Sequence, residues 1–281
     1  MTKQKTIKDT VTIEGVGLQT GAKATLRLKS SPANSGINFI RTDLPNKPLL
    51  NLQSINLNEL SSAAPERRTT LVMGPLQIQT TEHFLAALSG LGIDNIVAEL
   101  DSAELPGMDG SAKIFTDNLK AAGVIEQDAP RNVLKIDKAV WAMSDDSIIV
   151  ALPGDGFKVS YTLSYDDPFL GDQFFSARIN EKFFESEIAP ARTFCMEAEA
   201  RELLRRGLGK GANYDNTLVI GKDGPINTKL RFPDEPVRHK ILDLIGDLYI
   251  LGLPLEGHII AVKSGHRLNM ELVKKIKELG I

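Results

Sequence analysis

Cysteine is nearly absent from this sequence of 281 residues, in which Cys195 is the only one. A single cysteine excludes an internal disulfide and any metal site made of several thiolates. Histidine is also scarce, with four residues at positions 83, 239, 258 and 266. A metal site in this chain must therefore be built from histidine and carboxylate side chains.

Long apolar runs and an excess of one charge are missing as well. The sequence has no stretch of about 18 apolar residues, and its first residues lack the apolar core of about 7–15 residues that a signal peptide contains. The formal net charge is only −3, without a long run of like charges. We therefore expect no transmembrane segment, a cytoplasmic location and no nucleic-acid partner.

What is present is the composition of a globular protein, with 42% hydrophobic and 25% charged residues. The length favours two domains. Residues 123–132 are polar, contain Pro130 and show no apolar periodicity, which predicts a linker. We therefore predict an N-terminal domain at 1–127 and a C-terminal domain at 128–281.

Both parts contain a helix, a glycine that ends it and an apolar strand, in that order. The first helix is expected to start at Glu82 and to end before Gly90 and Gly92, and a strand follows at 95–100. The second begins at Pro236 and ends at Gly252, before a strand at 257–262 and a last helix near Leu268. The pattern predicts an α+β fold and weakly indicates an internal duplication.

On the second helix, His239, Asp243 and Asp247 are spaced i, i+4, i+8, so their side chains share one face. A histidine and a carboxylate one turn apart can both bind a zinc ion, and the third group can hold another histidine in place. A solvated helix face with an ordinary charge pair is the alternative. The apolar neighbours of the two aspartates favour the metal, because buried carboxylates need partners.

Two further histidines have polar surroundings that suggest chemistry. Glu82 and His83 are adjacent in a first helical turn, where His83 could be a third ligand and Glu82 a base beside it. An acidic residue that merely favours the helix dipole is the alternative. His266 follows a buried-type strand and could donate a proton, or it could be a loop histidine without a role. His258 begins a strand and is interpreted as structural.

Several short strings occur in order along nearly the whole chain: TEHFLAAL at 81–88, GIDNIV at 92–97, MDGSA at 108–112, ARTF at 191–194, VRHKILDLIGDL at 237–248 and KSGH at 263–266. In order and spacing they resemble the UDP-3-O-acyl-N-acetylglucosamine deacetylase family. The resemblance implies two domains of similar layering, each a β-sheet with two helices, packed face to face around an active site in the cleft between them. It also implies zinc-dependent removal of the N-acetyl group of UDP-3-O-acyl-N-acetylglucosamine, which commits this sugar nucleotide to lipid A synthesis.

The resemblance assigns a role to each matching residue. The metal ligands would be His83, His239 and Asp243, holding one Zn²⁺, with Fe²⁺ as an alternative metal. The catalytic residues would be Glu82 as general base, His266 as protonated acid, Asp247 as the residue that orients His266, and Thr193 as a donor to the oxyanion. The substrate-binding residues would be Lys240, Phe194, Leu18, Leu203 and Leu204. The leucines, together with Leu208, would line an apolar passage for the acyl chain near an insert at 193–220.

The sequence departs from the family pattern at three positions. Gln19 stands where the family usually has histidine, and Ser147 and Asp167 stand where many members have a lysine and a histidine near the diphosphate. These departures leave a catalytically silent sugar-nucleotide binding relative open as an alternative. A non-haem iron enzyme also stays open, because such enzymes use two histidines and a carboxylate as well. We expect the chain to act as a monomer.

Overall fold

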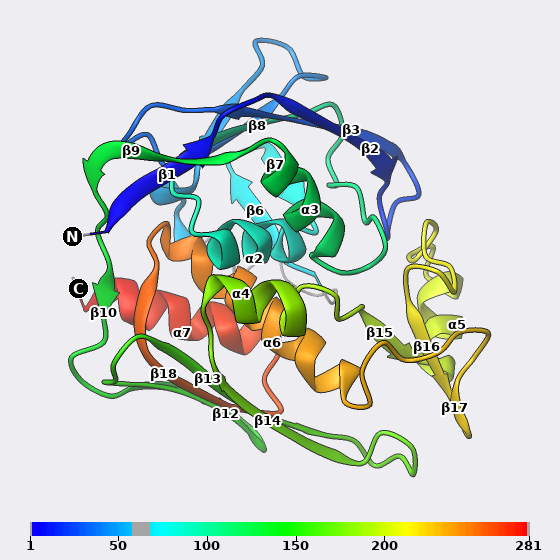
Figure 1. The fold of residues 1–281 in the computed structure, drawn as a ribbon. Coiled ribbons are helices and arrows are strands. Elements are labelled where there is room, and N and C mark those ends of the chain that lie inside the picture. Colours follow the sequence, from blue (N-terminus) through cyan, green and yellow to red (C-terminus); the bar gives the residue numbers. More distant parts are fainter. Residues whose placement is uncertain (1, 58–67, 280–281) are drawn as a thin grey trace.

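The structure is a computed structural model that describes residues 2–57 and 68–279, and it has four layers (Figure 1). A mixed β-sheet forms each outer layer, and two layers of helices lie between the sheets. One helix layer contains α2 (Glu82–Leu91) and α3 (Lys113–Ala121), and the other contains α6 (Glu235–Leu248) and α7 (His266–Glu278). The α+β class predicted from the sequence is confirmed.

The first sheet has the strand order β2-β3-β8-β4-β5, in which β8 is parallel to β4 and the other neighbours are antiparallel. Its strands are β2 (Val11–Val16), β3 (Lys23–Ser30), β8 (Ile96–Leu100), β4 (Ile37–Arg41) and β5 (Leu49–Asn51). In the chain, α2 precedes the central strand β8 and α3 follows it.

The second sheet repeats this topology with the order β11-β12-β18-β13-β14, in which only β18 and β13 are parallel along the path. Its strands are β11 (Val140–Ser144), β12 (Ser147–Leu152), β18 (Leu255–Val262), β13 (Phe157–Ser164) and β14 (Asp172–Arg178), with β10 (Leu134–Lys135) added beside β18. Helix α6 precedes the central strand β18 and α7 follows it. The two halves thus share strand order, pairing sense and helix placement, as the weak repeat in the sequence indicated.

Smaller elements surround these layers. They are β1 (Lys3–Ile7), η1 (Leu52–Ser54), β6 (Thr70–Met73), β7 (Leu76–Gln79), β9 (Val124–Pro130), α4 (Glu181–Phe183), η2 (Phe184–Ile188), β15 (Phe194–Met196), α5 (Glu197–Arg205), β16 (Leu218–Gly221), β17 (Gly224–Pro225) and η3 (Tyr249–Leu251). Strands β15, β16 and β17 form a small sheet that lies with α5 to one side of the helix layers (Figure 1).

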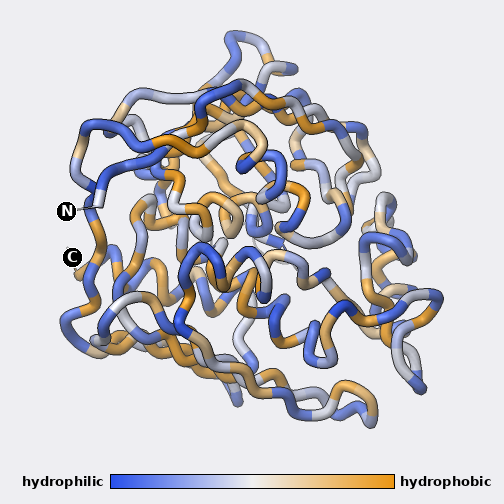
Figure 2. Tube along the Cα trace, in the orientation of Figure 1, coloured by the Kyte–Doolittle hydropathy of each residue, from blue (hydrophilic) through white to orange (hydrophobic). Residues whose placement is uncertain are grey.

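The core follows from the alternation of apolar residues in the strands and from the apolar faces of the helices. In β18 every second residue from Leu255 to Ala261 is buried against the helices. Figure 2 shows apolar residues along both sheets and the helices between them, while many connecting loops are hydrophilic. Helices α2 and α6 approach closely at Gly246, where an added Cβ would lie 2.0 Å from the Glu82 carbonyl oxygen. This contact brings the start of α2 against the last turn of α6.

The segment predicted as a linker, residues 123–132, has regular structure over most of its length. Strand β9 occupies most of this segment and pairs antiparallel with β1, with Val124 opposite Ile7. Most β9 residues are exposed or half-buried, so the segment lacks the apolar alternation that marks a strand with one buried face. The division at residue 128 stays a prediction, and it falls inside this strand. Within the described residues, no helix combines the length and apolar character that a membrane crossing requires.

Candidate active site

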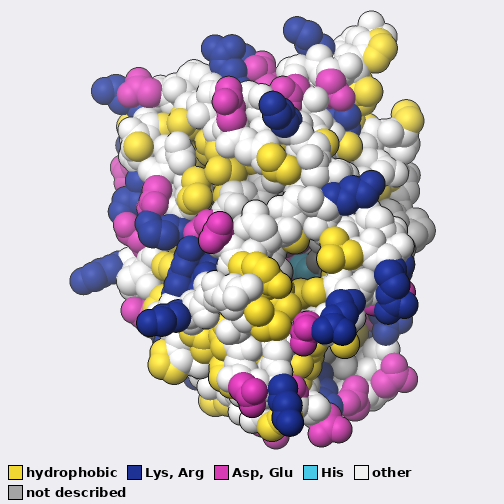
Figure 3. Space-filling model, turned by 90° about the vertical axis from the view of Figure 1, so that its right-hand side faces the viewer, with side chains coloured by type: hydrophobic (Ala, Val, Ile, Leu, Met, Phe, Trp, Pro, Cys, Tyr) yellow, Lys and Arg dark blue, Asp and Glu magenta, His cyan; other side chains and the backbone are white. Residues whose placement is uncertain are grey.

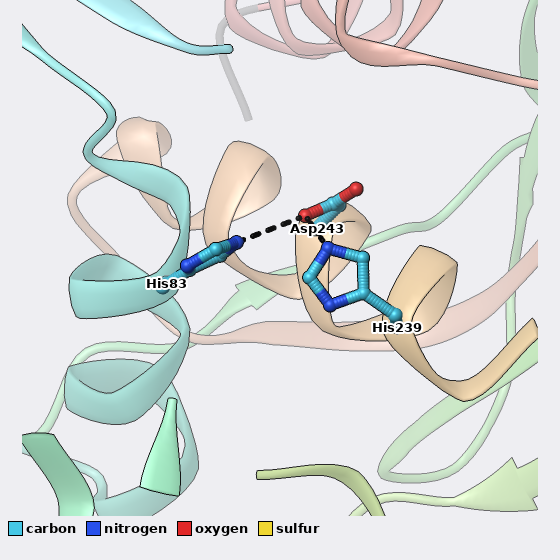
Figure 4. A group of neighbouring side chains, drawn as sticks. All are labelled: His83, His239 and Asp243. Carbon is cyan, nitrogen blue, oxygen red and sulfur yellow. Dashed lines mark ion pairs between the residues drawn. The ribbon is translucent and has the colours of Figure 1, made fainter. Parts of the chain in front are cut away.

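The two helices that meet at Gly246 bring three potential metal ligands together (Figure 4). His83 is the second residue of α2, while His239 and Asp243 lie one turn apart on α6. All three are buried, and one ligand atom from each lies within 4.8 Å of the others. The sequence spacing on α6 placed two of these residues on one face, and the packing of α2 on α6 adds the third.

The distances within this group suit a small cation. The Oδ1 atom of Asp243 lies 3.2 Å from Nε2 of His239 and 3.7 Å from Nε2 of His83. Two ligand atoms about 2.1 Å from a tetrahedral zinc ion would be roughly 3.4 Å apart. The Nδ1 atom of His239 is hydrogen-bonded to the Ala191 carbonyl at 3.0 Å, which leaves Nε2 to face the group. The donor set therefore fits Zn²⁺.

The protonation states also suit metal binding. Burial lowers the pKa of His83 to about 3, and the charge of His239 contributes in the same direction. Burial alone would raise the pKa of Asp243, but the charges of His239 and Lys240 outweigh it and hold this pKa well below the usual value. A neutral imidazole and an ionised carboxylate are the forms that bind metals.

Glu82 lies next to the ligand group with its side chain almost fully buried. Burial raises its pKa to about 7, the charge of His266 opposes that rise, and Asp243 and Asp247 add to it. The Oε2 atom accepts a hydrogen bond from the Thr69 N–H at 3.0 Å. A carboxylate with a pKa near neutrality is suited to general base catalysis.

His266 is the first residue of α7, so this helix begins slightly earlier than the sequence predicted. Its Nδ1 atom lies 2.8 Å from Oδ2 of Asp247, and its Nε2 atom points toward the metal group, 3.9 Å from Oδ2 of Asp243. Burial alone would lower the pKa of His266, but the charge and hydrogen bond of Asp247 raise it to about 9. The imidazole is thus positively charged at neutral pH and can act as an acid.

Sequence reasoning missed two residues of this network, Thr69 and Asn269. The hydroxyl of Thr69 donates to Oδ1 of Asp247, and the side-chain amide of Asn269 donates to its Oδ2 at 2.7 Å. Asn269 lies three positions after His266 on α7, a spacing that places both on one helix face and could have identified it. Thr69 stands just before a short strand, where no local pattern marks it.

The group lies in a cavity of about 970 Å³. Figure 3 shows a hollow with a histidine at its base and hydrophobic side chains around it. The substrate-binding and oxyanion residues expected from the sequence all line this cavity: Leu18, Thr193, Phe194, Leu203, Leu204 and Lys240. Leu208, which we expected beside the other leucines, is described by the structure but lies outside the cavity wall.

The expected substrate-binding residues differ in how firmly they are held. Lys240 donates to Oδ2 of Asp243 at 2.9 Å, and the Phe194 ring meets the His239 ring edge-on at 6.4 Å. Leu18 is buried against Gly107, where an added Cβ would lie 2.2 Å from the leucine Cγ. Leu204, in contrast, is 62% exposed. The apolar wall is therefore rigid near Leu18 and open toward solvent along α5.

The three departures from the family pattern have different surroundings. Gln19 accepts a hydrogen bond from the Gly209 N–H at 3.1 Å and so connects the turn after β2 to the loop after α5. Ser147 lines the cavity. Asp167 accepts from the N–H groups of Phe169 and Leu170, both at 2.9 Å, and among the described residues it stabilises its own loop without lining the cavity.

Comparison with known proteins agrees with this geometry. The family model described as LpxC, UDP-3-O-acyl N-acetylglycosamine deacetylase, matches residues 4–278. A UDP-3-O-acyl-N-acetylglucosamine deacetylase of Anaeromyxobacter sp. (strain Fw109-5) is 41% identical over 97% of this chain and 88% of its own length. Proteins of the same name from Thermodesulfovibrio yellowstonii and Trichormus variabilis are 41% and 37% identical, each over 99% of this chain and over 92% and 99% of their own lengths. The chain therefore belongs to the UDP-3-O-acyl-N-acetylglucosamine deacetylase family.

Proposed function

We propose that this protein hydrolyses the N-acetyl group of UDP-3-O-acyl-N-acetylglucosamine to give UDP-3-O-acyl-glucosamine and acetate, the committed step of lipid A synthesis. The observation that carries the proposal is the placement of Glu82 and His266 beside the buried group of His83, His239 and Asp243 in one cavity. Three protein ligands with an acid and a base beside them are the arrangement of a hydrolytic zinc site. Family membership supplies the substrate.

His83, His239 and Asp243 would hold the zinc ion, which fits their donor set and protonation states. When bound, Zn²⁺ polarises the amide carbonyl and lowers the pKa of a bound water molecule to about 7. The side chain of Glu82 would accept a proton from the attacking water. Because Glu82 is buried and has a raised pKa, it can take that proton near neutral pH.

The hydroxyl of Thr193 and the charged imidazole of His266 would donate to the oxygen that becomes negative as water adds to the carbonyl carbon. One lost donor of this kind typically costs about 10²–10³ in rate. Asp247 keeps the Nδ1 side of His266 occupied, so Nε2 faces the cavity. From there His266 would give its proton to the amine nitrogen as the C–N bond breaks and acetate leaves.

The cavity offers different chemistry at different places, which suits a substrate with a nucleotide and an acyl chain. Leu18, Leu203 and Leu204 supply apolar walls, and Lys240 lies near the metal group. The apolar part would take the acyl chain along α5, and Lys240 would contact the polar part of the substrate. We further propose that the protein acts in the cytoplasm, where nucleotide sugars are made. We also propose that it is a monomer, which light scattering of the purified protein would test.

The alternative interpretations have less support. An iron oxygenase would use the two histidines and the carboxylate but would give Glu82 and His266 no task. A silent binding relative would have lost at least one of these chemical groups, and all of them are present and close together. The chain also belongs to a family of hydrolases.

The direct test is incubation of the purified protein with UDP-3-O-acyl-N-acetylglucosamine and measurement of the acetate released. We expect release that stops when a chelator removes the metal and returns when Zn²⁺ is added back. Tight binding of the sugar nucleotide without acetate would instead support the silent relative. Activity that returns with Fe²⁺ and needs oxygen would support the iron enzyme.

A further inference from the structure

Thr69 touches both members of the proposed acid–base pair. It lies directly before β6 and is 3% exposed. Its backbone N–H donates to Oε2 of Glu82 at 3.0 Å, and its hydroxyl lies 3.1 Å from Nδ1 of His266. The same hydroxyl donates to Oδ1 of Asp247. One residue thus holds the proposed base through its main chain and the partner of the proposed acid through its side chain.

The hydrogen bonds of Asp247 show what the hydroxyl contributes. Its Oδ2 atom receives the Nδ1–H of His266 at 2.8 Å and the amide of Asn269 at 2.7 Å. The Thr69 hydroxyl occupies the other oxygen, Oδ1. A carboxylate held at both oxygens cannot rotate, so Oδ2 stays directed at His266. Loss of the hydroxyl would free Oδ1 and leave a fully buried oxygen without this donor.

We propose that Thr69 is a positioning residue that fixes the relative orientation of Glu82 and His266 and so sets the rate of the deacetylation. This inference rests on the proposed function, because it assigns the residue to the same reaction. The active site would then draw on Glu82, His83 and Thr69 from the N-terminal half, and Thr69 would be the residue that reaches across to Asp247 on α6.

A purely structural role for Thr69 makes a different prediction. The Thr69 carbonyl accepts a hydrogen bond from the Thr81 N–H at 3.3 Å and so helps to hold the start of α2. A residue that only supported this backbone would affect stability in proportion to the packing lost. It would not lower kcat in a well-folded, zinc-loaded protein, and it would not act through Asp247.

The test compares Thr69→Val, which keeps the shape but removes the hydroxyl, with Thr69→Ser, which keeps the hydroxyl. Thr116→Val is the matched control, because Thr116 on α3 is 1% exposed and its hydroxyl donates to the carbonyl of Ala112, the residue before this helix. We measure kcat, KM, zinc content and thermal unfolding of each holoenzyme. We expect Thr69→Val to lower kcat by about 10–100-fold with KM and zinc content unchanged, as loss of an outer partner of an active-site group typically does. Thr69→Ser should recover most of kcat, and Thr116→Val should change stability only.

Two further measurements separate positioning from support. In an Asp247→Asn background, Thr69→Val should cause no additional loss of kcat, because the two residues act through one contact. In proton NMR of the zinc-loaded protein, the downfield signal of the imidazole N–H that donates to Asp247 should shift in Thr69→Val and stay in place in Thr116→Val. If Thr69→Val does not fold, Thr69→Ala removes the same hydroxyl and leaves space instead of a methyl group.

Wild-type kcat in a folded hydroxyl-free variant would overturn the inference. Additive losses in the Asp247→Asn background, or equal losses in the serine and valine variants, would also overturn it. An inactive wild-type protein would overturn the proposed function instead, and the inference with it. The NMR comparison would then still show whether Thr69 orders the contact between Asp247 and His266.

Discussion

The two halves of the molecule have the same sheet topology, but they contribute to the site in different ways. Helix α2 supplies Glu82 and His83 from its first turn, whereas α6 supplies His239, Asp243 and Asp247 from a face that extends over two further turns. A first turn presents neighbouring residues in different directions, which suits different roles. A continuous face stacks side chains toward one place, which suits ligands and their supports.

The helices that follow the central strands, α3 and α7, also differ in what their first residues contribute. Helix α7 begins on His266, while α3 begins on Lys113 after a turn at Gly110 that packs against the C-terminal half. An added Cβ at Gly110 would lie 1.7 Å from the Asn216 carbonyl oxygen. In the C-terminal half the helix therefore starts on a residue of the candidate site, and in the N-terminal half the turn before the helix packs against the other half. One repeated scaffold thus places the proposed base, Glu82, in one copy and the proposed acid, His266, in the other.

The largest expected effect comes from removing one proposed metal ligand from either half of the molecule. His83→Ala and His239→Ala should each lose bound zinc and all metal-dependent deacetylation, because two remaining ligands hold the ion poorly. Metal analysis after dialysis and acetate release measure both effects. His258→Ala is the matched control, since His258 contacts Ser160 on the second sheet and should keep zinc and activity. Retention of zinc by either ligand variant would contradict the shared site.

Replacement of Glu82 by glutamine should separate chemistry from metal binding. The variant keeps the size of the side chain but removes the base, so kcat should fall by about 10²–10⁴ while zinc content stays the same. Single-turnover kinetics with metal analysis of the same sample would measure this. Near-normal deacetylation by Glu82→Gln would mean that another residue accepts the proton from water.

The pH dependence of kcat/KM should be bell-shaped. Its acidic side should depend on Glu82 from the N-terminal half and its basic side on His266 from the C-terminal half. Glu82 must be ionised, so activity rises with pH through its pKa of about 7, and His266 must be protonated, so activity falls through its pKa of about 9. A bound cation lowers both pKa values, so each side of the bell lies at or below these points. Activity should change about tenfold per pH unit beyond each side.

The Glu82→Gln variant should change both sides of this pH profile. The acidic side of the bell should disappear because no base titrates there. The negative charge of Glu82 helps to raise the pKa of His266, so its loss should move the basic side to lower pH. A basic side that does not move would show that the two groups are not coupled across the halves.

Gly246→Ala tests the contact that joins the helices. A methyl group there would meet the Glu82 carbonyl oxygen at 2.0 Å, so the helices must separate. Overpacking of this kind typically costs about 1–3 kcal/mol of unfolding free energy, and it should also lower kcat by displacing Glu82. Gly154→Ala is the control, because its nearest neighbour would lie at an ordinary 3.4 Å. Equal thermal stability of both variants would show that the contact tolerates movement.

The sequence was informative where function depends on spacing along one helix. The i, i+4, i+8 pattern placed His239, Asp243 and Asp247 on one face of α6, as the structure has them. Strong helix signals, Pro236 at the start and Gly252 at the end, also gave α6 and its continuation correctly. These features are local, so a single sequence contains them.

The sequence did not predict the features that depend on contacts between residues far apart in the chain. Thr69 reaches Asp247 across 178 positions, and nothing near Thr69 indicates that partner. Strand β9 was missed because its pairing with β1 buries little apolar surface and leaves no periodic signal. The meeting of His83 with the α6 ligands depends on how closely two helices pack, which the spacing of residues within either helix does not specify.

The smallest expected effect concerns the proposed acyl passage, to which the C-terminal half contributes Leu203 and Leu204. Leu203→Ala should weaken binding of a long-chain substrate by about 1 kcal/mol, because the leucine is only half-buried, and so raise KM about fivefold. A substrate with a short acyl group should be unaffected, and kcat should not change. Leu208→Ala is the matched control, since Leu208 is also half-buried but lies outside the cavity wall. If Leu203→Ala raises KM equally for short and long chains, the leucine supports the fold of α5 and the acyl chain binds elsewhere.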